Sequence, residues 1–206
     1  MFKVIPILTQ DLKGTKDADI LEIWFEKPAF TKPTIAKPAF AKKINKPIIY
    51  KSESPSKNLQ EEAVKLSTYI DLDIETPTRV IKKIKRINPE IKLIISYHNF
   101  KETPYQKDLQ KLQKKILKKK PDIIKFATHA KAIVDSFRML DFLAEISKKE
   151  QKAICICMGE HGLLTRIAGH MFGNQMMYFS RTKSKSSKTA LGQITIKEFN
   201  EYNHES

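Results

Sequence analysis

The sequence predicts a (β/α)8 barrel, slightly short for this fold and with an abbreviated, proline-rich first third. Two observations lead to this prediction. Eight short apolar segments alternate with helical or loop crossovers, and alternating β and α segments form parallel sheets with right-handed crossovers. In addition, no glycine-rich phosphate-binding loop follows the first apolar segment, so a doubly wound open sheet is the less favoured alternative. We expect residues 1–206 to form one domain with a sizeable core.

The expected strands are short runs rich in β-branched and aromatic residues and bounded by turn signals. The run Ile123-Ile124-Lys125-Phe126-Ala127, which follows a Pro-Asp turn signal, is the clearest example. Residues 69–75 alternate strictly, so that aliphatic and acidic side chains face opposite sides. The eight expected strands are residues 2–8, 18–25, 47–51, 69–75, 91–97, 123–127, 153–158 and 175–179.

Apolar periodicity predicts helices in most of the connections between these strands. Asn58 is the expected N-cap of the first long helix, because Glu61 follows three residues later. In the longest helix one apolar side is expected, formed by Ile133, Phe137, Leu140 and Leu143. The expected helices are residues 58–67, 77–87, 104–119, 130–148, 163–172 and 194–202.

The connection over residues 27–46 is unusual because the tetrapeptide Lys-Pro-Ala-Phe occurs in it twice, at residues 27–30 and 37–40. Its prolines argue against a long helix, since proline removes a helical hydrogen bond and clashes with the preceding turn. We therefore expect an irregular crossover with a turn of helix near its end.

The charge is strongly positive, with 38 Lys and Arg against 23 Asp and Glu, a formal net charge of +15. These basic residues are spread over many segments, and no arginine-rich or aromatic-interleaved patch stands out. A solvated basic surface is therefore expected, without nucleic acid as a partner.

The remaining composition predicts a reduced, cytoplasmic protein without a membrane partner. Cys155 and Cys157 are expected as small core residues of one strand face. The apolar N-terminal stretch is too short for a signal peptide, and no apolar stretch is long enough to span a membrane. The histidines and cysteines show no ligand spacing, so we expect neither a metal nor another cofactor.

The barrel prediction places functional groups at the C-terminal ends of strands. Lys125 lies inside a buried run, where its stem either reaches a strand end or leaves the ammonium in a pocket of low dielectric constant. In the second case the charged form is disfavoured, the pKa falls, and a neutral amine becomes available for imine chemistry. Other polar residues at or near expected strand ends are Glu22, Lys51, Asp73, Glu75 and His98, and the seventh strand ends at Met158-Gly159.

Four segments between about Asp71 and the end of the chain resemble, in the same order, motifs of the type I 3-dehydroquinate dehydratases. These segments are Ser96-Tyr97-His98-Asn99-Phe100 followed by Thr103-Pro104; Asp122-Ile123-Ile124-Lys125-Phe126-Ala127; Met158-Gly159-Glu160-His161-Gly162-Leu163-Leu164-Thr165-Arg166-Ile167-Ala168-Gly169 followed by Phe172-Gly173; and Thr189-Ala190-Leu191-Gly192-Gln193-Ile194. Residues 19–23, which include Glu22, match more weakly.

The resemblance implies dehydration of 3-dehydroquinate to 3-dehydroshikimate in the shikimate pathway of aromatic amino acid biosynthesis. Lys125 would form a Schiff base with the substrate ketone, and His98 would act as general base and then general acid. Arg166 would hold the substrate carboxylate, while Thr189 and Gln193 would bind substrate and help to close the mouth. Glu22 and Lys51 are also implied as substrate-binding residues, and a homodimer is left open.

The chain departs from the family pattern at three strand positions. Asp73 takes the place of a glutamate that would orient His98, so that either Asp73 or Glu75 is expected to support the histidine. Trp24 and Lys51 stand where the family has arginines. These changes keep two alternatives in view: another Schiff-base lyase or aldolase on the same barrel, and a non-catalytic, basic nucleic-acid-binding protein.

Overall fold

The computed structural model describes residues 1–7, 10–25, 38–52, 55–182 and 192–203. Thr189 lies outside these described residues. So do residues 27–37 of the crossover, which include the first Lys-Pro-Ala-Phe copy. The second copy contributes the short helix α1 (Pro38–Ala41), which agrees with the helical turn expected near the end of that crossover.

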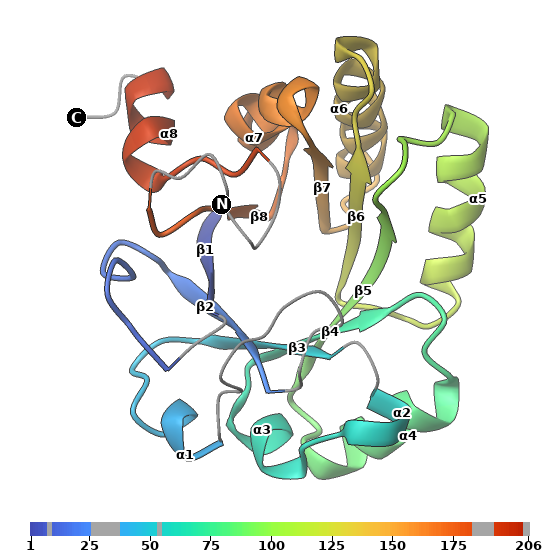
Figure 1. Cartoon of the computed structure of the whole chain (residues 1–206). Coiled ribbons are helices and arrows are strands. Elements are labelled where there is room, and N and C mark those ends of the chain that lie inside the picture. The colour runs from blue at the N-terminus through green and yellow to red at the C-terminus, as the bar shows by residue number, and fades with distance from the viewer. Residues whose placement is uncertain (8–9, 26–37, 53–54, 183–191, 204–206) are drawn as a thin grey trace.

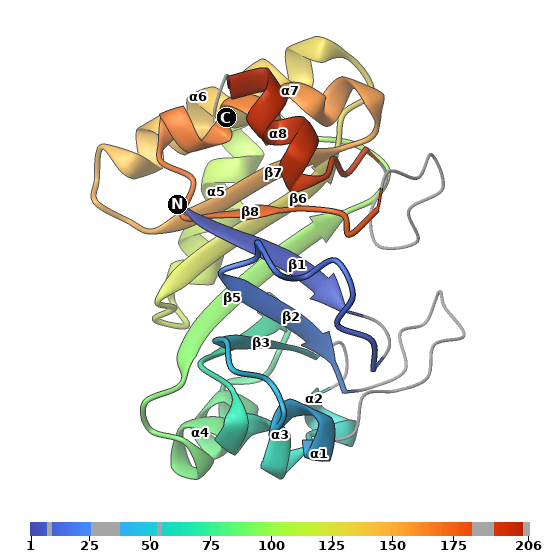
Figure 2. The same cartoon turned by 90° about the vertical axis from the view of Figure 1, so that its left-hand side faces the viewer.

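Eight parallel strands form one sheet that curves into a nearly closed barrel (Figures 1 and 2). The strand order is β7-β6-β5-β4-β3-β2-β1-β8, so β1 pairs with both β2 and β8. This confirms the predicted barrel. The strands are β1 (Phe2–Ile7), β2 (Ile20–Trp24), β3 (Ile48–Ser52), β4 (Tyr69–Asp73), β5 (Lys92–Asn99), β6 (Ile123–His129), β7 (Ala153–Met158) and β8 (Met176–Tyr178).

The seam between β7 and β8 is closed near the start of both strands. Ala153 forms an isolated parallel bridge with Asn174, and the Gln175 amide donates a hydrogen bond to the Ala153 carbonyl. The Asn174 side chain also bonds both the amide and the carbonyl of Cys155, at 2.7 and 3.1 Å. One buried asparagine therefore supplies strand-like hydrogen bonds at this seam.

Helices surround the barrel on its outer face (Figure 1). They cover the sheet because parallel β-α-β crossovers place each helix against the strands that it connects. The helices are α1, α2 (Pro55–Asn58), α3 (Glu61–Leu66), α4 (Thr78–Ile87), α5 (Gln106–Leu117), α6 (Ile133–Ser147), α7 (Leu163–Ala168) and α8 (Ile196–Asn203), with 3-10 turns at Glu160–Gly162 and Gly169–Phe172.

Two apolar clusters stabilise the fold. The larger one lies between the sheet and the helices and includes Phe126, Phe142 and Ile84. The smaller one contains alternate strand residues, including Ile20, Ile94 and Tyr178, and fills the barrel interior. Because side chains alternate along each strand, the residue two positions further on also faces the interior, nearer the C-terminal end of the strand. At this level the interior side chains are polar: Glu22, Lys51, Asp71, Ser96 and Lys125.

Two local predictions are wrong. Asn58 ends α2 instead of capping a long helix, since α3 begins after Gln60 and has no side-chain cap. Ile133 and Phe137 are exposed on α6, at 49% and 58%, while Leu140 and Leu143 are buried. The buried side of the helix also includes Ser136 and Met139, so the packed face is rotated away from Ile133 and Phe137. Cys155 and Cys157 are free, buried core residues, as expected.

None of the helices in the described segments has the length and apolar character needed to cross a bilayer.

Candidate active site

The centre of the site is the Asp71 carboxylate, which joins two buried lysines inside the barrel. Lys125 Nζ donates to Asp71 Oδ2 at 2.7 Å, and Lys51 Nζ donates to Asp71 Oδ1 at 2.9 Å. The Ser96 hydroxyl donates to Oδ1 at 2.6 Å. The four side chains come from the adjacent strands β3, β4, β5 and β6. They meet because Lys51 is paired with Asp71, and Ser96 with Lys125, in the strand register.

Two further groups surround the Lys125 ammonium. Its Nζ donates to the Tyr178 hydroxyl at 3.0 Å and lies 4.2 Å from the centroid of the Tyr178 ring. Glu22 Oε2 lies 3.5 Å from the same nitrogen. An ammonium has three N–H donors, so Asp71, Tyr178 and Glu22 account for all three directions. Lys125 as a whole is 5% exposed, and these three contacts fix the position of its amine.

Of the two alternatives for Lys125, the charge balance contradicts the one in which burial lowers its pKa. Burial does act in that direction, but Asp71, Tyr178 and Glu22 outweigh it and raise the pKa well above the usual lysine value. For Asp71, burial raises the pKa, and the Lys125 and Lys51 ammoniums more than offset this, so its pKa is held far below the usual range. The resting site therefore contains a protonated Lys125 beside an ionised Asp71.

His98 lies near the end of β5, close enough to these charges to be affected by them. Removal from water and the positive charges of Lys51 and Lys125 lower the pKa of His98 well below its usual value, while Asp71 opposes this shift. Its ring is half-buried and stacks on Phe100, with the ring centroids 6.2 Å apart. A neutral imidazole at the mouth of the barrel is suited to accept a proton.

Asp73 and Glu75, the two residues expected to support His98, contact groups outside the cluster of Asp71 and the two lysines. Asp73 Oδ1 accepts a hydrogen bond of 2.8 Å from the Glu75 amide, which stabilises the turn after β4. Glu75 is exposed and forms an ion pair with Lys115 on α5. Within the described residues, the β4 carboxylate that acts on His98 and contacts both lysines is Asp71.

The substitutions on β2 and β3 change the polar contacts of the site. Trp24 Nε1 donates to Glu22 Oε1 at 3.3 Å, so an indole holds the glutamate. Lys51 places a single ammonium between Asp71 and Ser96, with its Nζ 3.4 Å from the serine hydroxyl. A point charge of this kind cannot make the forked contact of an arginine with a carboxylate.

Arg166 and Gln193 belong to the C-terminal part of the chain, on α7 and just before α8. Arg166 on α7 is 2% exposed, and burial lowers its pKa to about 10. Gln193 follows Gly192, whose φ is +78° and whose absent side chain lets the backbone pack against Gly159. A Cβ at Gly192 would lie 2.6 Å from the Gly159 carbonyl oxygen, so this close approach brings Gln193 to the end of β7.

Three members of the site are not predicted by the sequence: Asp71, Ser96 and Tyr178. Alternation in β4 placed Asp71 on the same face as Asp73, and the barrel model could have identified it as the deeper interior carboxylate. Ser96 was visible as part of a motif without a role. No local signal marks Tyr178, because its contact with Lys125 joins β8 to β6 across the barrel.

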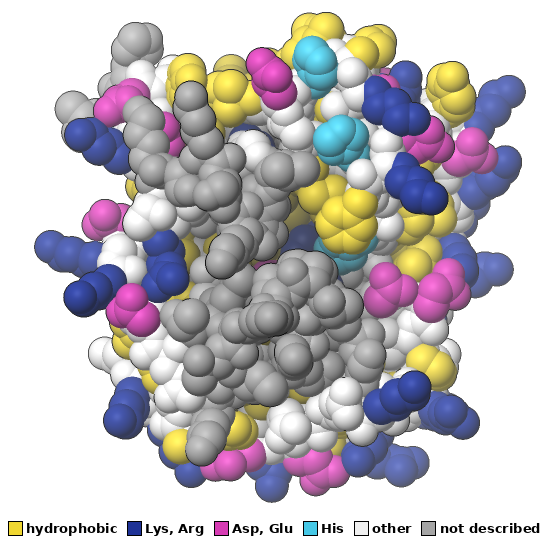
Figure 3. Space-filling model, in the orientation of Figure 1, with side chains coloured by type: hydrophobic (Ala, Val, Ile, Leu, Met, Phe, Trp, Pro, Cys, Tyr) yellow, Lys and Arg dark blue, Asp and Glu magenta, His cyan; other side chains and the backbone are white. Residues whose placement is uncertain are grey.

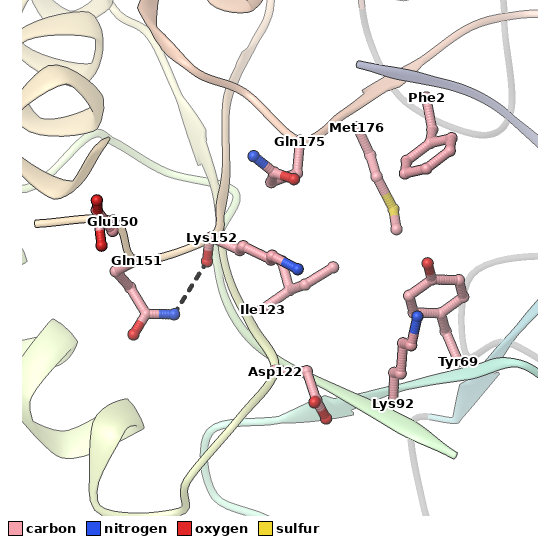
Figure 4. Close-up of a pocket in the computed structure, with 10 residues that line it drawn as sticks. All are labelled: Phe2, Tyr69, Lys92, Asp122, Ile123, Glu150, Gln151, Lys152, Gln175 and Met176. Carbon is pink, nitrogen blue, oxygen red and sulfur yellow. Dashed lines mark hydrogen bonds between the residues drawn. The ribbon is translucent and has the colours of Figure 1, made fainter. Parts of the chain in front are cut away.

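A separate hollow of about 350 Å³ lies at the opposite end of the barrel, among the starts of the strands (Figure 4). Tyr69, Lys92 and Lys152 are among its lining residues, and the Lys92 ammonium lies 5.5 Å from the centroid of the Tyr69 ring. It shares no lining residue with the Asp71 cluster. In the described segments no group of three His, Cys, Asp or Glu side chains is arranged to bind a metal ion.

Comparisons with known proteins agree with the barrel fold. Residues 32–205 match the model of the Type I 3-dehydroquinase family. A 3-dehydroquinate dehydratase of Dehalococcoides mccartyi is 34% identical over 146 residues, which are 70% of this chain and 64% of that protein. One of Methanocaldococcus jannaschii is 38% identical over 142 residues, 68% of this chain and 61% of that protein.

The matched region thus spans less than two thirds of the length of these two curated relatives. The crystal structure of the 3-dehydroquinate dehydratase from Aquifex aeolicus has a TM-score of 0.77 to this chain at 27% identity. That likeness covers 98% of this chain and 97% of the crystallised one. The chain belongs to the type I 3-dehydroquinase family.

Proposed function

We propose that this protein dehydrates 3-dehydroquinate to 3-dehydroshikimate, a step of the shikimate pathway, through a Schiff base on Lys125. The observation that supports this most directly is the amine of Lys125, buried in the barrel among two carboxylates and a phenol and close to a neutral histidine. Imine formation turns the substrate ketone into an electron sink that acidifies the neighbouring C–H bond.

The first requirement of this mechanism is a neutral amine. Asp71 is a poor proton acceptor because two ammoniums hold its pKa far below normal. Glu22, 3.5 Å from Lys125 Nζ, is the second carboxylate in contact with the amine. We therefore assign Glu22 as the group that accepts the Lys125 proton before the amine attacks the ketone.

The elimination itself falls to His98. Its neutral imidazole removes the proton from the carbon next to the imine and returns a proton to the departing hydroxyl, which leaves as water. The new C=C bond is conjugated with the imine, and hydrolysis then releases the product and restores the lysine. Arg166, Lys51, Gln193 and Thr189 bind the substrate in this proposal.

Borohydride trapping tests the central step. The protein is mixed with 3-dehydroquinate and borohydride, and intact and peptide masses are recorded; we expect one reduced adduct, on Lys125. Lys125→Ala should lose both adduct and turnover, whereas the control Lys92→Met, at the other end of the barrel, should keep both. Normal turnover in Lys125→Ala would refute the mechanism.

A second candidate is another Schiff-base lyase or aldolase, which Trp24 and Lys51 favour because they alter the contacts available to the substrate. It predicts trapping of Lys125 with other keto compounds and none with 3-dehydroquinate. The same borohydride experiment, run over a panel of keto acids, separates the two activities.

A further inference from the structure

Tyr178 is the one uncharged group that the described structure places in direct hydrogen-bonding contact with the Lys125 amine. Its hydroxyl oxygen lies 3.0 Å from Nζ, and the residue is 6% exposed. The ring belongs to the apolar cluster inside the barrel, together with Val4 and Met176. The phenol is thus anchored from below, with its hydroxyl at the boundary between the apolar and polar layers.

The chemistry of the hydroxyl differs from that of the other two partners of the amine. The Asp71 carboxylate is ionised, so it accepts hydrogen bonds and donates none, and Glu22 is the group assigned above to take up the Lys125 proton. The phenol accepts a bond from Lys125 and keeps a proton of its own. Burial and the nearby Glu22 charge raise the pKa of Tyr178 well above its usual value, so it remains protonated at neutral pH.

Resting on the imine chemistry proposed above, we propose that Tyr178 is a catalytic residue that carries a proton from Lys125 Nζ to the substrate oxygen during imine formation. When the neutral amine adds to the ketone, the N–C bond forms and the C=O π pair moves onto oxygen. The nitrogen is then positive and the oxygen negative. Nζ gives a proton to the Tyr178 oxygen while the Tyr178 proton passes to the alkoxide, which leaves a neutral carbinolamine and an unchanged tyrosine.

The geometry suits this transfer because Nζ and the alkoxide oxygen are attached to the same carbon. A hydroxyl within hydrogen-bonding distance of Nζ therefore also lies within reach of that oxygen. Asp71 has no proton to give, and it is occupied by Lys51 and Ser96 on its other oxygen. Two residues therefore transfer protons in this site. Tyr178 moves a proton from the nitrogen to the oxygen of the adduct, and His98 removes the proton from the carbon next to the imine.

Tyr178→Phe is the matched test, because it removes the hydroxyl and keeps the ring that packs in the barrel. The rate of adduct formation is measured by mixing enzyme with 3-dehydroquinate and quenching with borohydride at successive times. We expect this rate and kcat to fall by about 10²-fold, the range for loss of a proton-transfer group, with KM little changed. Tyr50→Phe is the control, since Tyr50 is a fully buried strand tyrosine on the helix-facing side of the sheet.

A substrate deuterated at the carbon next to the ketone gives a second readout. In Tyr178→Phe imine formation becomes the slow step, so the deuterium isotope effect on kcat should fall towards 1 relative to the wild type. Equal adduct rates in the variant and the wild type would overturn the role of Tyr178 alone. A folded wild type that gives no Lys125 adduct with 3-dehydroquinate would overturn the proposed function, and this proposal with it.

Discussion

Asp71 decides the electrostatics of the site at the scale of single residues. Its two oxygens contact Lys125 and Lys51, and all three side chains are at most 7% exposed. A buried charge is expensive unless it is paired, so removal of the shared carboxylate would leave two ammoniums with only Glu22 nearby. The Lys125 pKa and the folding free energy therefore depend on the same oxygen atoms.

Asp71→Asn keeps the shape of the side chain and removes its charge. We expect the free energy of unfolding in urea to fall by about 3–5 kcal/mol, as for other broken buried ion pairs. The pKa of Lys125 should also fall, so that borohydride trapping extends to lower pH than in the wild type. Asp108→Asn, in an exposed pair with Lys111, is the control and should change stability by less than about 1 kcal/mol.

Asp71 also predicts how stability depends on acid pH. Because its folded pKa is depressed, its contribution is fully present above the unfolded pKa of about 4 and is lost as the pH falls from there towards the folded value. Between pH 6 and pH 3 the wild type should lose more unfolding free energy than Asp71→Asn. Parallel urea curves for the two proteins over this range would contradict the assignment.

His98 sets the acid limit of activity. Its pKa lies well below 6.5, so kcat/KM should stay high at pH 6.5 and fall only when the pH approaches the lowered pKa of His98. Lys51→Met removes one of the cations that lower the pKa, so the acid limb should move to higher pH. A profile of kcat/KM against pH checks this, with Lys92→Met as the control that should leave the limb in place.

At the scale of elements, Gly192 determines how the segment before α8 packs on the barrel. It lets the segment before α8 pack on the end of β7, at a positive φ and with no room for a Cβ. Gly192→Ala should therefore displace Gln193 and raise KM by about tenfold, since small misplacements of binding groups are costly. Gly14→Ala also has a positive φ but meets its nearest atom at 3.2 Å, so it should strain the chain without raising KM.

The elements themselves followed the sequence pattern closely. Buried β-branched runs became β3, β5, β6 and β7 within one or two residues at each end, because burial on both faces of a parallel strand leaves a continuous apolar run. Two details differ from the pattern: the exposure of Ile133 and Phe137 on α6, and the break between α2 and α3. Apolar periodicity did not identify which side of α6 is packed, because Ser136 and Met139 are part of the buried side.

Asn174 is a test of closure at the scale of the whole molecule. Its side chain satisfies the amide and carbonyl of Cys155 at the seam of the barrel. Asn174→Ala would leave both groups buried without these bonds, at a cost of about 1–3 kcal/mol for each. The urea midpoint should fall accordingly, whereas Asn203→Ala, which loses one bond at the end of α8, should have a small effect.

On the face of the molecule drawn in Figure 3, the described residues show no single basic patch. In Figure 3 the Lys and Arg side chains lie mainly around the rim of this face, with Asp and Glu among them. Several form exposed ion pairs, such as Lys42–Glu62 and Lys83–Glu61. A nucleic-acid-binding protein would show affinity that falls steeply with salt. We expect no saturable binding of a labelled duplex at 0.15 M salt, measured by fluorescence anisotropy.

The strands, their parallel arrangement and the motifs that contain His98, Lys125 and Arg166 are predictable from the sequence, because they depend on local burial patterns and on short, contiguous segments. The charge state of Lys125 depends instead on contacts that exist only in the folded barrel. Asp71, Glu22 and Tyr178 lie 54, 103 and 53 residues away along the chain, and they meet the amine only when the barrel closes. Burial alone predicted a lowered pKa, whereas the carboxylates brought in by the closed barrel raise it.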